Sequence, residues 1–462
     1  MTNLGYTPEE PICAIATALA PGAIGIVRTS GKGSIELIQK VFSRPKALGE
    51  AKGNTLVYGW IKNPSDGERI DEVMLGVYRN PSSFTGEDMV EIFCHGGVKV
   101  VSAVLALLLK SGFRQAERGE FTFRAYINGK TDLTKAEAVR EIIDSKTDTS
   151  RSHAAGRLAG GLYQEIDSIK TLIVDTLATI EVGIEYPEDE ETIADSFDKA
   201  HLVEASSRLK SLSDSWKSEK LYQDGAKVVL AGKTNAGKSR LFNALLKEER
   251  AIVSDIEGTT RDWIESYVSF DGVPARLFDT AGIRETSDVI EAKGVELTKD
   301  LAHHADIILY LVDSTMGLKD EDKDFIDSAL KNQSETPLVV VWNKTDKEGA
   351  LPPPEGYDAI SISAKQGIGI GELTVKVKKL ILGSTDTTVQ GTGLGSQRQK
   401  ESVDEALERI NHALKTAEDS SYGLDAVVQD LEDSLDSLGE VTGSVTPDDV
   451  LGSIFSHFCV GK

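Results

Sequence analysis

The sequence predicts a multidomain α/β protein: an amino-terminal α+β domain, an all-α helical domain, and a phosphate-loop domain with a mixed, mostly parallel sheet inserted into the helical domain. The chain of 462 residues is long enough for about three domains of ordinary size. Between residues 225 and 383, apolar runs alternate with amphipathic stretches, a pattern typical of a parallel sheet wound with helices. Helical spacing of apolar residues occurs on both sides of that region, which indicates insertion.

The composition is that of a globular protein with a formal net charge of −23. Three cysteines, Cys13, Cys94 and Cys459, lie far apart, which favours neither a disulfide framework nor a zinc site and suits a reducing compartment. No apolar run reaches the length of a membrane span, and no signal or transit peptide is indicated. We therefore expect a soluble cytoplasmic protein with no membrane partner. Its charge disfavours loose binding of nucleic acid over the whole surface, so an RNA substrate requires a local basic patch or a basic partner.

Residues 11–128 show strands and turns with one helix, the pattern of an α+β domain. Strands are expected at residues 24–28 and 89–95, and a buried helix at residues 100–109.

Three polar residues stand out near these elements: Arg28 at a strand end, Glu91 inside an apolar strand, and Lys130 after a turn. The residue types alone favour a surface arginine, a solvent-facing glutamate and a turn lysine over a binding site.

Apolar residues recur at helical spacing from residue 131 to about residue 220, and again from residue 403 to residue 438. The acidic stretch at residues 185–191 interrupts the first region, and a solvated loop is favoured there over a metal-binding patch. Gly439 suits a helix stop. A final helix is expected to have Thr446 as its cap and Pro447 as its first residue, to carry apolar residues from Val450 to Phe458, and to be packed rather than frayed.

These features divide the chain into four segments. They are an amino-terminal domain, a first helical part, a nucleotide-binding domain and a second helical part, at residues 1–127, 128–222, 223–384 and 385–462 respectively.

The most specific motif is the phosphate loop at residues 232–239, which fits the pattern G-x-x-x-x-G-K-[ST]. An apolar run precedes it and a helical stretch follows, which is the strand-loop-helix context that the motif needs. The glycines let the backbone wrap a phosphate, and the helix amino end presents free N–H groups to it. Lys238 adds a positive charge, and the Ser239 hydroxyl can bind Mg²⁺.

Four further motifs follow in the order expected of a guanine-nucleotide site, each next to an expected strand. Thr260 is a candidate for completing Mg²⁺ binding and sensing the terminal phosphate, and Asp279 can hold Mg²⁺ through water. Asn343 and Asp346 belong to the sequence Asn-Lys-Thr-Asp, and a later strand ends in Ser-Ala-Lys at residues 363–365. An aspartate accepts hydrogen bonds from guanine N1–H and the exocyclic amine, whereas adenine presents an acceptor at N1, so Asp346 selects guanine.

One position departs from Ras-like proteins, in which a glutamine after the glycine of this motif orients the attacking water. Here that residue is Ile283, which cannot hydrogen-bond water. Another group must orient the water, and the candidates are Arg284, Glu285 and Glu291. No arginine finger is evident.

Several motifs, taken together with the phosphate loop, resemble one known family from end to end, the tRNA modification GTPases MnmE, also called TrmE. The fold that this implies is a folate-binding amino-terminal domain and a helical domain that holds a Ras-like GTPase domain. The motifs that carry the resemblance are Ser83–Asp88, His95–Gly97, Gly119–Thr122, Arg124–Lys130, Gly258–Asp262, Asp279–Glu285 and Phe458–Lys462.

The resemblance implies a folate site and dimerisation through the amino-terminal domain. Arg28, Glu91, Lys130 and Lys462 match the family's contacts to a tetrahydrofolate derivative, either 5-formyl- or methylene-tetrahydrofolate, as one-carbon donor. This reverses the interpretation favoured by the residue types alone.

The resemblance also implies GTP hydrolysis that is activated by K⁺ in place of an arginine finger. K⁺ is expected at Asn235 and at the carbonyls of Ser254, Ile256 and Thr259, Mg²⁺ at Ser239 and Thr260, and catalytic roles at Glu291 and Arg284. The expected GTP contacts are Asn235, Ala236, Gly237, Lys238, Ser239, Arg240, Ser254, Asp255, Ile256, Glu257, Gly258, Thr259, Thr260, Asp279, Thr280, Ala281, Gly282, Asn343, Lys344, Asp346, Ser363, Ala364 and Lys365.

The family works as a homodimer with the FAD-containing partner MnmG, or GidA, in a heterotetramer or larger complex. Together they add an aminomethyl or carboxymethylaminomethyl group to C5 of the wobble uridine of certain tRNAs. An Era- or Der-like regulatory GTPase of ribosome assembly is the alternative, but neither a KH domain nor a second GTPase domain is present to support it. A folate-binding aminomethyltransferase with a regulatory GTPase domain is a weaker one.

Three residues depart from the usual family pattern: Arg118 stands in place of proline, Tyr126 in place of phenylalanine, and Val460 in place of isoleucine. The first leaves the local turn geometry open. The role of Cys459 is also open, because no histidine or acid is placed beside it by the sequence.

Overall fold

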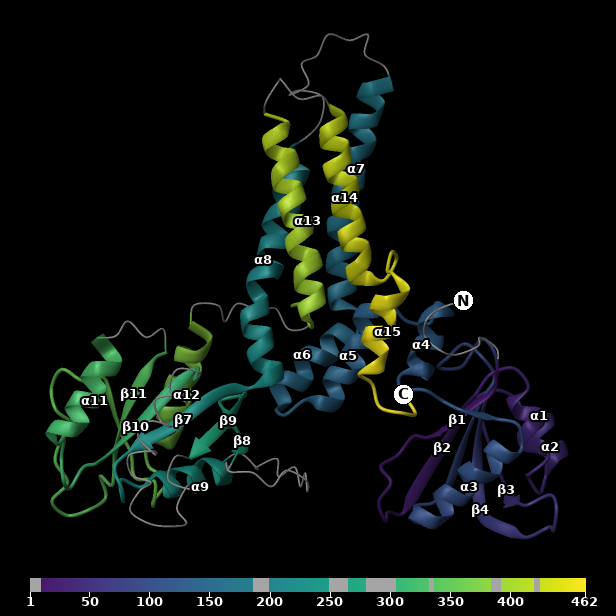
Figure 1. The fold of residues 1–462 in the computed structure, drawn as a ribbon, viewed down its shortest axis with the longest axis horizontal. Coiled ribbons are helices and arrows are strands. Elements are labelled where there is room, and N and C mark those ends of the chain that lie inside the picture. Colours follow the sequence, from purple (N-terminus) through teal and green to yellow (C-terminus); the bar gives the residue numbers. More distant parts are fainter. Residues whose placement is uncertain are drawn as a thin grey trace. The chain divides into compact units, whose positions relative to one another are not determined.

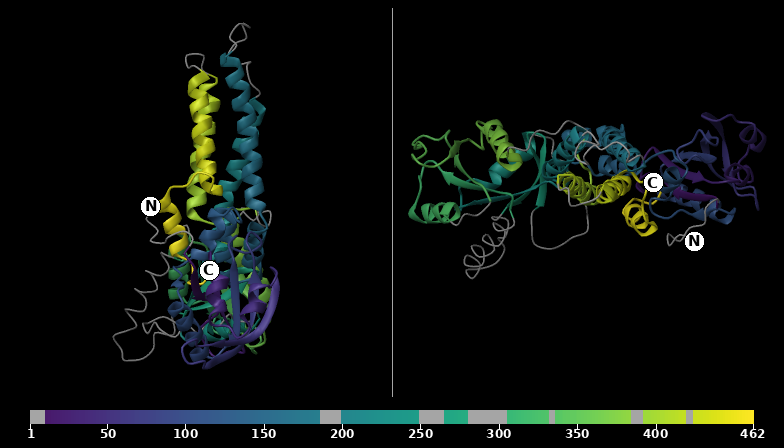
Figure 2. Two further views of the ribbon diagram at one scale, coloured as in Figure 1. Left: turned by 90° about the vertical axis from the view of Figure 1, so that its right-hand side faces the viewer. Right: turned by 90° about the horizontal axis from the view of Figure 1, so that it is seen from above.

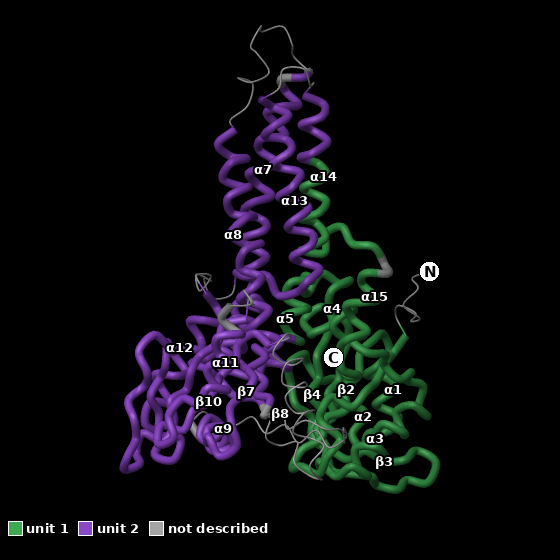
Figure 3. Tube along the Cα trace, turned by 60° about the vertical axis from the view of Figure 1, so that its left-hand side comes forward, with its two compact units in different colours: residues 1–140, 432–462 green, residues 141–431 purple. Residues whose placement is uncertain are grey.

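A computed structural model describes residues 10–185, 199–248, 265–279, 305–331, 336–383, 392–418 and 424–462. The chain forms two compact units, one of residues 1–140 with 432–462 and one of residues 141–431 (Figure 3). The boundaries between them fall within helix α5 (Leu133–Asp144) and helix α14 (Leu424–Thr442). The division into four segments expected from the sequence stays a prediction.

The first unit is built on a six-stranded sheet in the order β3-β4-β5-β2-β1-β6 (Figure 1). Its strands are β1 (Ile12–Ile15), β2 (Ile24–Ser30), β3 (Thr55–Lys62), β4 (Arg69–Tyr78), β5 (Met89–His95) and β6 (Arg114–Gln115). Its remaining helices are α1 (Ser34–Gln39), α2 (Pro45–Gly49), α3 (Val98–Lys110), α4 (Glu120–Ile127) and α15 (Asp448–Ser456).

Side chains alternate along the central strands, so one face of this sheet is buried. Val27, Leu75 and Ile92 point into a core that α3 completes with Val104 and Leu108. The opposite face carries the residues that alternate with them and is more exposed.

The expectation of one helix in residues 11–128 is wrong, because the structure has α1, α2, α3 and α4 there. Helices α1 and α2 are 6 and 5 residues long, too short to display a helical period in the sequence. Helix α4 is buried along most of its length, so it shows no polar stripe.

Helix α15 packs against α4, which confirms that the final helix is packed. The rings of Phe123 and Phe455 meet edge to face with centroids 5.2 Å apart. Gly119 adopts a left-handed conformation before α4, and a Cβ there would lie 2.6 Å from the Phe455 carbonyl oxygen. The helix stop expected at Gly439 is wrong: α14 runs to Thr442, and Gly443 is the residue with positive φ.

The second unit joins long helices to a second six-stranded sheet. Helices α7, α8 and α13 lie side by side (Figures 1 and 2). Its helices are α6 (Asp148–Leu158), α7 (Gly161–Glu185), α8 (Lys199–Asp224), α9 (Lys238–Glu248), α11 (Asp320–Lys331), α12 (Ile370–Leu382) and α13 (Gln397–Thr416). Its strands are β7 (Ala226–Gly232), β8 (Glu265–Phe270), β9 (Val273–Asp279), β10 (Ile307–Asp313), β11 (Leu338–Asn343) and β12 (Ala359–Ser361).

The second sheet has the strand order β12-β11-β10-β7-β9-β8, and every pairing except β8 with β9 is parallel. Helices α9 and α12 cover one face, and α11 covers the other. The central strands β7, β10 and β11 are therefore buried on both sides and have nearly continuous apolar sequences. The sheet lies in the chain between α8 and α13, so the predicted multidomain α/β architecture is confirmed. None of the described helices is long and apolar enough to cross a membrane.

Candidate functional site

The parallel strands bring the predicted nucleotide motifs to one edge of the second sheet. Strand β7 lies between β9 and β10, and the motifs follow the carboxyl ends of β7, β9, β11 and β12. Because the carboxyl ends of parallel strands share an edge, motifs far apart in the sequence lie close together there.

The phosphate loop leaves β7 at Gly232 and turns into α9 with backbone conformations that favour glycine. Gly232 and Gly237 have φ angles of 129° and 107°. A Cβ at Gly232 would overlap the Leu311 carbonyl oxygen, and one at Gly237 would overlap the Asn343 amide nitrogen. Asn235 is also left-handed, with φ 66°, which asparagine tolerates better than most residues. No other residue type fits the two glycine positions without rearrangement.

Lys238, the motif lysine, is buried and donates hydrogen bonds to the loop itself. Its Nζ lies 2.5 Å from the Gly232 carbonyl oxygen and 2.9 Å from that of Lys233. The Lys238 ammonium thus lies inside the phosphate loop. There a phosphate oxygen can replace a backbone carbonyl oxygen as the acceptor of its hydrogen bond. Ser239 is the next residue, in the first turn of α9, the position from which a hydroxyl can bind Mg²⁺.

Asn343 connects three of the predicted motifs. Its Nδ2 donates to the Ala236 carbonyl at 2.8 Å, and its Oδ1 accepts from the Ala364 backbone N–H at 3.1 Å. Asn343 is 1% exposed, so both hydrogen bonds are shielded from water. The ends of β11 and β12 are fixed against the phosphate loop in this way.

A pocket of about 280 Å³ opens beside these contacts. Asp346 lies in it and accepts a hydrogen bond of 2.7 Å from the Ser363 hydroxyl. That hydrogen bond lowers the pKa of the Asp346 carboxyl, so the group is an anionic acceptor at neutral pH. The lining residues are Arg240, Asn343, Lys344, Asp346, Lys347, Ala364 and Lys365, of which only Lys347 is absent from the predicted contacts.

Asp313 was also missed by the sequence analysis. It ends β10 and binds Lys344, with Oδ2 2.5 Å from the lysine Nζ. Burial raises the pKa of Asp313, but hydrogen bonds from Lys344 and Thr315 outweigh it and lower the value. The sequence indicates Asp313 because this residue stands at the end of an apolar run, as the other motifs do.

Many predicted nucleotide and cation residues lie outside the described residues, and their contacts stay predictions. Asp279 ends β9 beside Leu230 of β7, which places its backbone next to the phosphate loop. The residues outside the described ranges are Ser254, Asp255, Ile256, Glu257, Gly258, Thr259, Thr260, Thr280, Ala281, Gly282, Ile283, Arg284, Glu285 and Glu291. Among the described residues, no group of three or more His, Cys, Asp or Glu side chains could hold a metal ion.

In the first unit, Arg28 and Glu91 form a direct pair. They lie opposite each other on β2 and β5, and the Arg28 Nε donates to Glu91 Oε1 at 2.9 Å. Their side chains are 21% and 15% exposed, so they are not the freely solvated residues favoured by residue type. The guanidinium lies 5.7 Å from the ring centroids of Phe84 and of Phe121.

The carboxyl-terminal segment reaches this pair. Arg28 donates to the Gly461 carbonyl at 3.2 Å, and Lys462 accepts a hydrogen bond of 3.2 Å from the Phe121 backbone. Arg118 pairs with Val460 in an isolated antiparallel bridge, so the arginine that replaces proline lies in extended backbone. The structure thus brings Arg28, Glu91 and the residues around Lys462 together.

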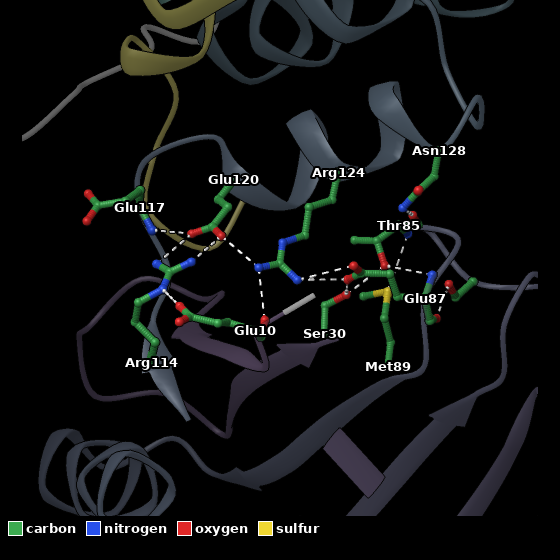
Figure 4. A network of polar contacts seen from close by, with 11 residues as sticks. Glu10, Ser30, Thr85, Glu87, Met89, Arg114, Glu117, Glu120, Arg124 and Asn128 are labelled. Carbon is green, nitrogen blue, oxygen red and sulfur yellow. Dashed lines mark hydrogen bonds and ion pairs between the residues drawn. The ribbon is translucent and has the colours of Figure 1, made fainter. Parts of the chain in front are cut away.

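Lys130 contacts the loop that supplies Phe84. Its Nζ donates to the Pro81 carbonyl at 3.0 Å, and its side chain packs close to Gly86. The same loop is fixed from the other side by Asn128, whose Nδ2 donates to the Thr85 carbonyl at 2.8 Å (Figure 4).

A buried network of charged residues supports this loop and was not foreseen from the sequence (Figure 4). Arg124, 1% exposed, lies 3.0 Å from Glu87 of the loop and 2.9 Å from Glu120 one turn earlier on α4. Arg114 pairs with Glu120 at 2.5 Å. Burial raises the pKa of Glu120, but the hydrogen bond from Arg114 and the other donors and charges around it outweigh burial and lower it. Three of the motifs quoted for the family resemblance, Ser83–Asp88, Gly119–Thr122 and Arg124–Lys130, therefore meet in one network.

The three cysteines differ in exposure. Cys13 and Cys94 are buried, and burial raises their pKa values to about 12 and about 11. Cys459 is exposed, next to the segment that reaches Arg28. It is the accessible thiol of the three.

Comparison with known proteins agrees with this arrangement. The family model "MnmE helical domain" matches residues 133–459, and "GTP-binding protein TrmE N-terminus" matches residues 11–130. The tRNA modification GTPase MnmE of Treponema denticola is 49% identical over 99% of both chains, and that of Carboxydothermus hydrogenoformans is 40% identical over 98% of this chain and 100% of the other. A crystal structure of Aquifex aeolicus Era is 27% identical and covers 40% of this chain and 66% of that one, with a TM-score of 0.27. By the family models and the full-length relatives, the chain belongs to the MnmE (TrmE) family of tRNA modification GTPases.

Proposed function

We propose that the protein hydrolyses GTP in the cytoplasm and that this hydrolysis serves the addition of an aminomethyl or carboxymethylaminomethyl group to C5 of the wobble uridine of certain tRNAs. The observation that carries the nucleotide part is the pocket lined by Asn343 and Asp346, of which Asn343 is hydrogen-bonded to the phosphate loop and Asp346 to Ser363. Similarity over the full length to relatives named tRNA modification GTPases supports the tRNA part.

The described residues fit GTP at both ends. The Asp346 carboxylate accepts from the guanine N1–H and amine, and adenine would present an acceptor to it instead. At the other end, Lys238 and the amides of the loop bind phosphate oxygens. Nucleotide choice and phosphate binding thus come from groups already fixed in place.

Ser239, with Thr260, would hold Mg²⁺, which when bound neutralises charge on the β- and γ-phosphates. Asn235 would supply a side-chain ligand for K⁺, together with carbonyls of residues 254, 256 and 259, and the family resemblance is what supports this. Glu291 and Arg284 are the groups we propose for orienting the attacking water, because Ile283 cannot do so.

The first unit fits a folate derivative as one-carbon donor. The Glu91 carboxylate can accept from the adjacent N–H and amino donors of a pterin ring, and Arg28 and the exposed Phe84 provide flat surfaces against which a ring can stack. Lys130 and Lys462 complete the set we propose for this site.

We further propose that a second copy of the chain covers the open face of this sheet. Arg28 shares that face with exposed apolar side chains, because it alternates with buried neighbours on β2 as they do on their own strands. Contiguous exposed apolar residues mark interaction surfaces. These side chains are Ile24, Leu56, Tyr58 and Met74. The FAD-containing partner MnmG, in a heterotetramer or larger complex, would then supply most of the basic surface for tRNA, which a chain with net charge −23 lacks.

Steady-state GTP hydrolysis in K⁺ and in Na⁺ at equal ionic strength tests the nucleotide and cation parts. We expect faster hydrolysis in K⁺, and equal rates would contradict the cation assignment. Glu291→Ala should slow hydrolysis by a factor of ~10² or more while GTP affinity stays nearly unchanged. A loss of affinity would show that Glu291 acts in binding instead.

A further inference from the structure

Helix α6 carries a buried histidine and a buried arginine that belong to neither proposed site. His153 Nδ1 lies 3.0 Å from Glu219 Oε1 on α8, and Arg157 lies 2.8 Å from Glu219 Oε2. Arg157 also binds Glu141 at the end of α5, with a separation of 2.5 Å. We call these four residues the α6 cluster. The side chains of Arg157 and Glu219 are almost completely buried.

The α6 cluster lies where the chain enters the nucleotide-binding sheet. Glu219 and Tyr222 belong to the last turns of α8, and β7 begins two residues after that helix ends. The ring of Tyr222 lies 4.7 Å from that of His153, centroid to centroid. The strand that carries the phosphate loop therefore starts directly from the cluster.

The chain also leaves the sheet domain through the same cluster. Arg157 donates to the Gly393 carbonyl at 3.3 Å, and Gln223 donates to the Gly395 carbonyl at 2.8 Å. A Cβ at Gly393 would lie 2.7–2.9 Å from three side-chain atoms of Glu219, which is 0% exposed. Only glycine lets the returning chain lie this close to the buried carboxylate.

The opposite end of α6 touches the sheet domain itself. Thr147 caps the helix by accepting from the Ser150 backbone N–H at 3.1 Å, and its Oγ1 donates to the Gly272 carbonyl at 2.9 Å. Gly272 lies in the turn between β8 and β9, so close to Thr149 that a Cβ would overlap its hydroxyl. Lys146 Nζ lies 5.6 Å from the ring centroid of Tyr267 on β8.

The β8–β9 hairpin joins the motif of Thr260, our candidate for sensing the terminal phosphate, to the motif of Asp279, our candidate for holding Mg²⁺ through water. Residues 255–262 precede β8 in the chain, and β9 ends at Asp279, the first residue of the second motif. Both motifs are therefore joined directly to the hairpin along the chain. The turn of the hairpin is itself hydrogen-bonded to Thr147, the N-cap residue of α6.

We propose that α6 is the element through which the GTPase domain and the long helices respond to each other, with Thr147 connecting it to the β8–β9 hairpin and the α6 cluster connecting it to α5, α8 and the returning chain. This rests on GTP binding as proposed above. The helix is 11 residues long and has polar contacts to its neighbours near both ends. Charges buried this completely cost free energy unless each is paired, so the α6 cluster has one well-defined arrangement rather than many.

Burial raises the pKa of Glu219, but the hydrogen bond from His153 and the charge of Arg157 outweigh it and lower the pKa. The carboxylate thus stays charged and paired at neutral pH. A displaced hairpin would strain the arrangement of the α6 cluster. Through that strain, the nucleotide state of the GTPase domain would affect the long helices.

Hydrogen exchange of the full-length protein, with GDP and with the β,γ-imido analogue of GTP, tests the proposal. In the wild type, amides of α6 and of residues 392–399 should exchange at rates that differ between the two nucleotides by ~5- to 150-fold, the range of common coupling between sites.

Two variants should abolish this difference. Thr147→Asp keeps a cap acceptor but has no donor for the Gly272 carbonyl, and Gly393→Ala displaces the Glu219 carboxylate. Thr147→Ser retains both hydrogen bonds and should behave as the wild type. Gly371→Ala is the matched control for the second variant, because a Cβ there would meet nothing within 4 Å. If Gly393→Ala does not fold, hydrogen exchange of Thr147→Asp alone tests the proposal.

Affinity for a fluorescent GDP analogue is measured first in all variants. Absence of binding by the wild type overturns the proposed function and the coupling together. Normal binding with no nucleotide-dependent change in α6 overturns the coupling alone, as does a wild-type response in Thr147→Asp. Loss of the response in Thr147→Asp, with unchanged GDP affinity and an unchanged melting temperature, supports it.

Discussion

The charged network beneath the first unit's candidate site can be tested by Arg124→Met, which replaces the guanidinium with an apolar side chain of similar length. Arg124 binds Glu87 and Glu120 together with the Glu10 carbonyl, and it is 1% exposed. Removing it leaves two carboxylates without one of their partners. Such removal of one member of a buried ion pair destabilises strongly.

The magnitude follows from what each carboxylate retains. Glu120 keeps Arg114 at 2.5 Å, so it stays paired. Glu87 keeps the Ser30 hydroxyl at 2.7 Å and is 18% exposed, which offsets only part of its loss. The Arg124 Nε has no hydrogen-bond partner, so the native state already bears some cost of burying the guanidinium. We therefore expect the lower end of the usual range, about 3 kcal/mol.

Hydrogen exchange at β2 and β5 provides a readout confined to the first unit. A loss of about 3 kcal/mol should speed exchange of the most protected amides by ~10²-fold. Arg151→Met is the matched control, because that arginine is 57% exposed and its ion pair with Asp148 is at the surface. If Arg124→Met changes exchange no more than Arg151→Met does, the network does not stabilise the unit as argued.

Further outcomes follow from the site geometry. Asp346→Asn should weaken GTP binding by ~10²-fold or more and favour xanthosine triphosphate, whose base presents N1–H to the amide oxygen and a C2 carbonyl to the amide N–H; equilibrium titration checks this, with the surface variant Asp320→Asn as control. The pKa of the Glu120 carboxyl is lowered in the folded state. This carboxyl therefore contributes fully to stability above its ordinary pKa of 4.5, and the contribution is lost as pH falls through the lowered pKa. Urea unfolding of the first unit should therefore show no dependence on Glu120 between about pH 6 and 8. Among the three thiols of the native protein, a disulfide reagent at pH 8 should react rapidly with Cys459 alone, and fast reaction of either buried cysteine would contradict the burial described above.

The nucleotide site was predictable because each of its motifs is local. A phosphate loop and a base-recognising aspartate are short sequences next to apolar strands, and parallel strands bring such ends together whatever the details of packing. Asp313 obeys the same rule at the end of β10 and could have been found by it. The helices α1, α2 and α4 could not, because two are too short and one too buried to show a period.

The pairing in the first unit was beyond reach of the residues alone. Arg28 and Glu91 are 63 positions apart, and their contact depends on the register of two antiparallel strands. A shift of one residue would turn one of them to the opposite face. The family resemblance pointed to both residues, but neither it nor the residue types indicated that they bind each other. The same holds for Arg124, whose partners come from separate parts of the chain.

The central claim is that GTP turnover by this protein supports modification of the wobble uridine. The most direct measurement is mass analysis of nucleosides in tRNA from a strain that lacks the gene, complemented with the wild type or with Asp346→Asn at equal protein levels. We predict that C5-aminomethyl and carboxymethylaminomethyl uridines are absent in the deletion strain, return with the wild type, and fail to return with Asp346→Asn. Unaltered wobble uridines in the deletion strain would contradict the account.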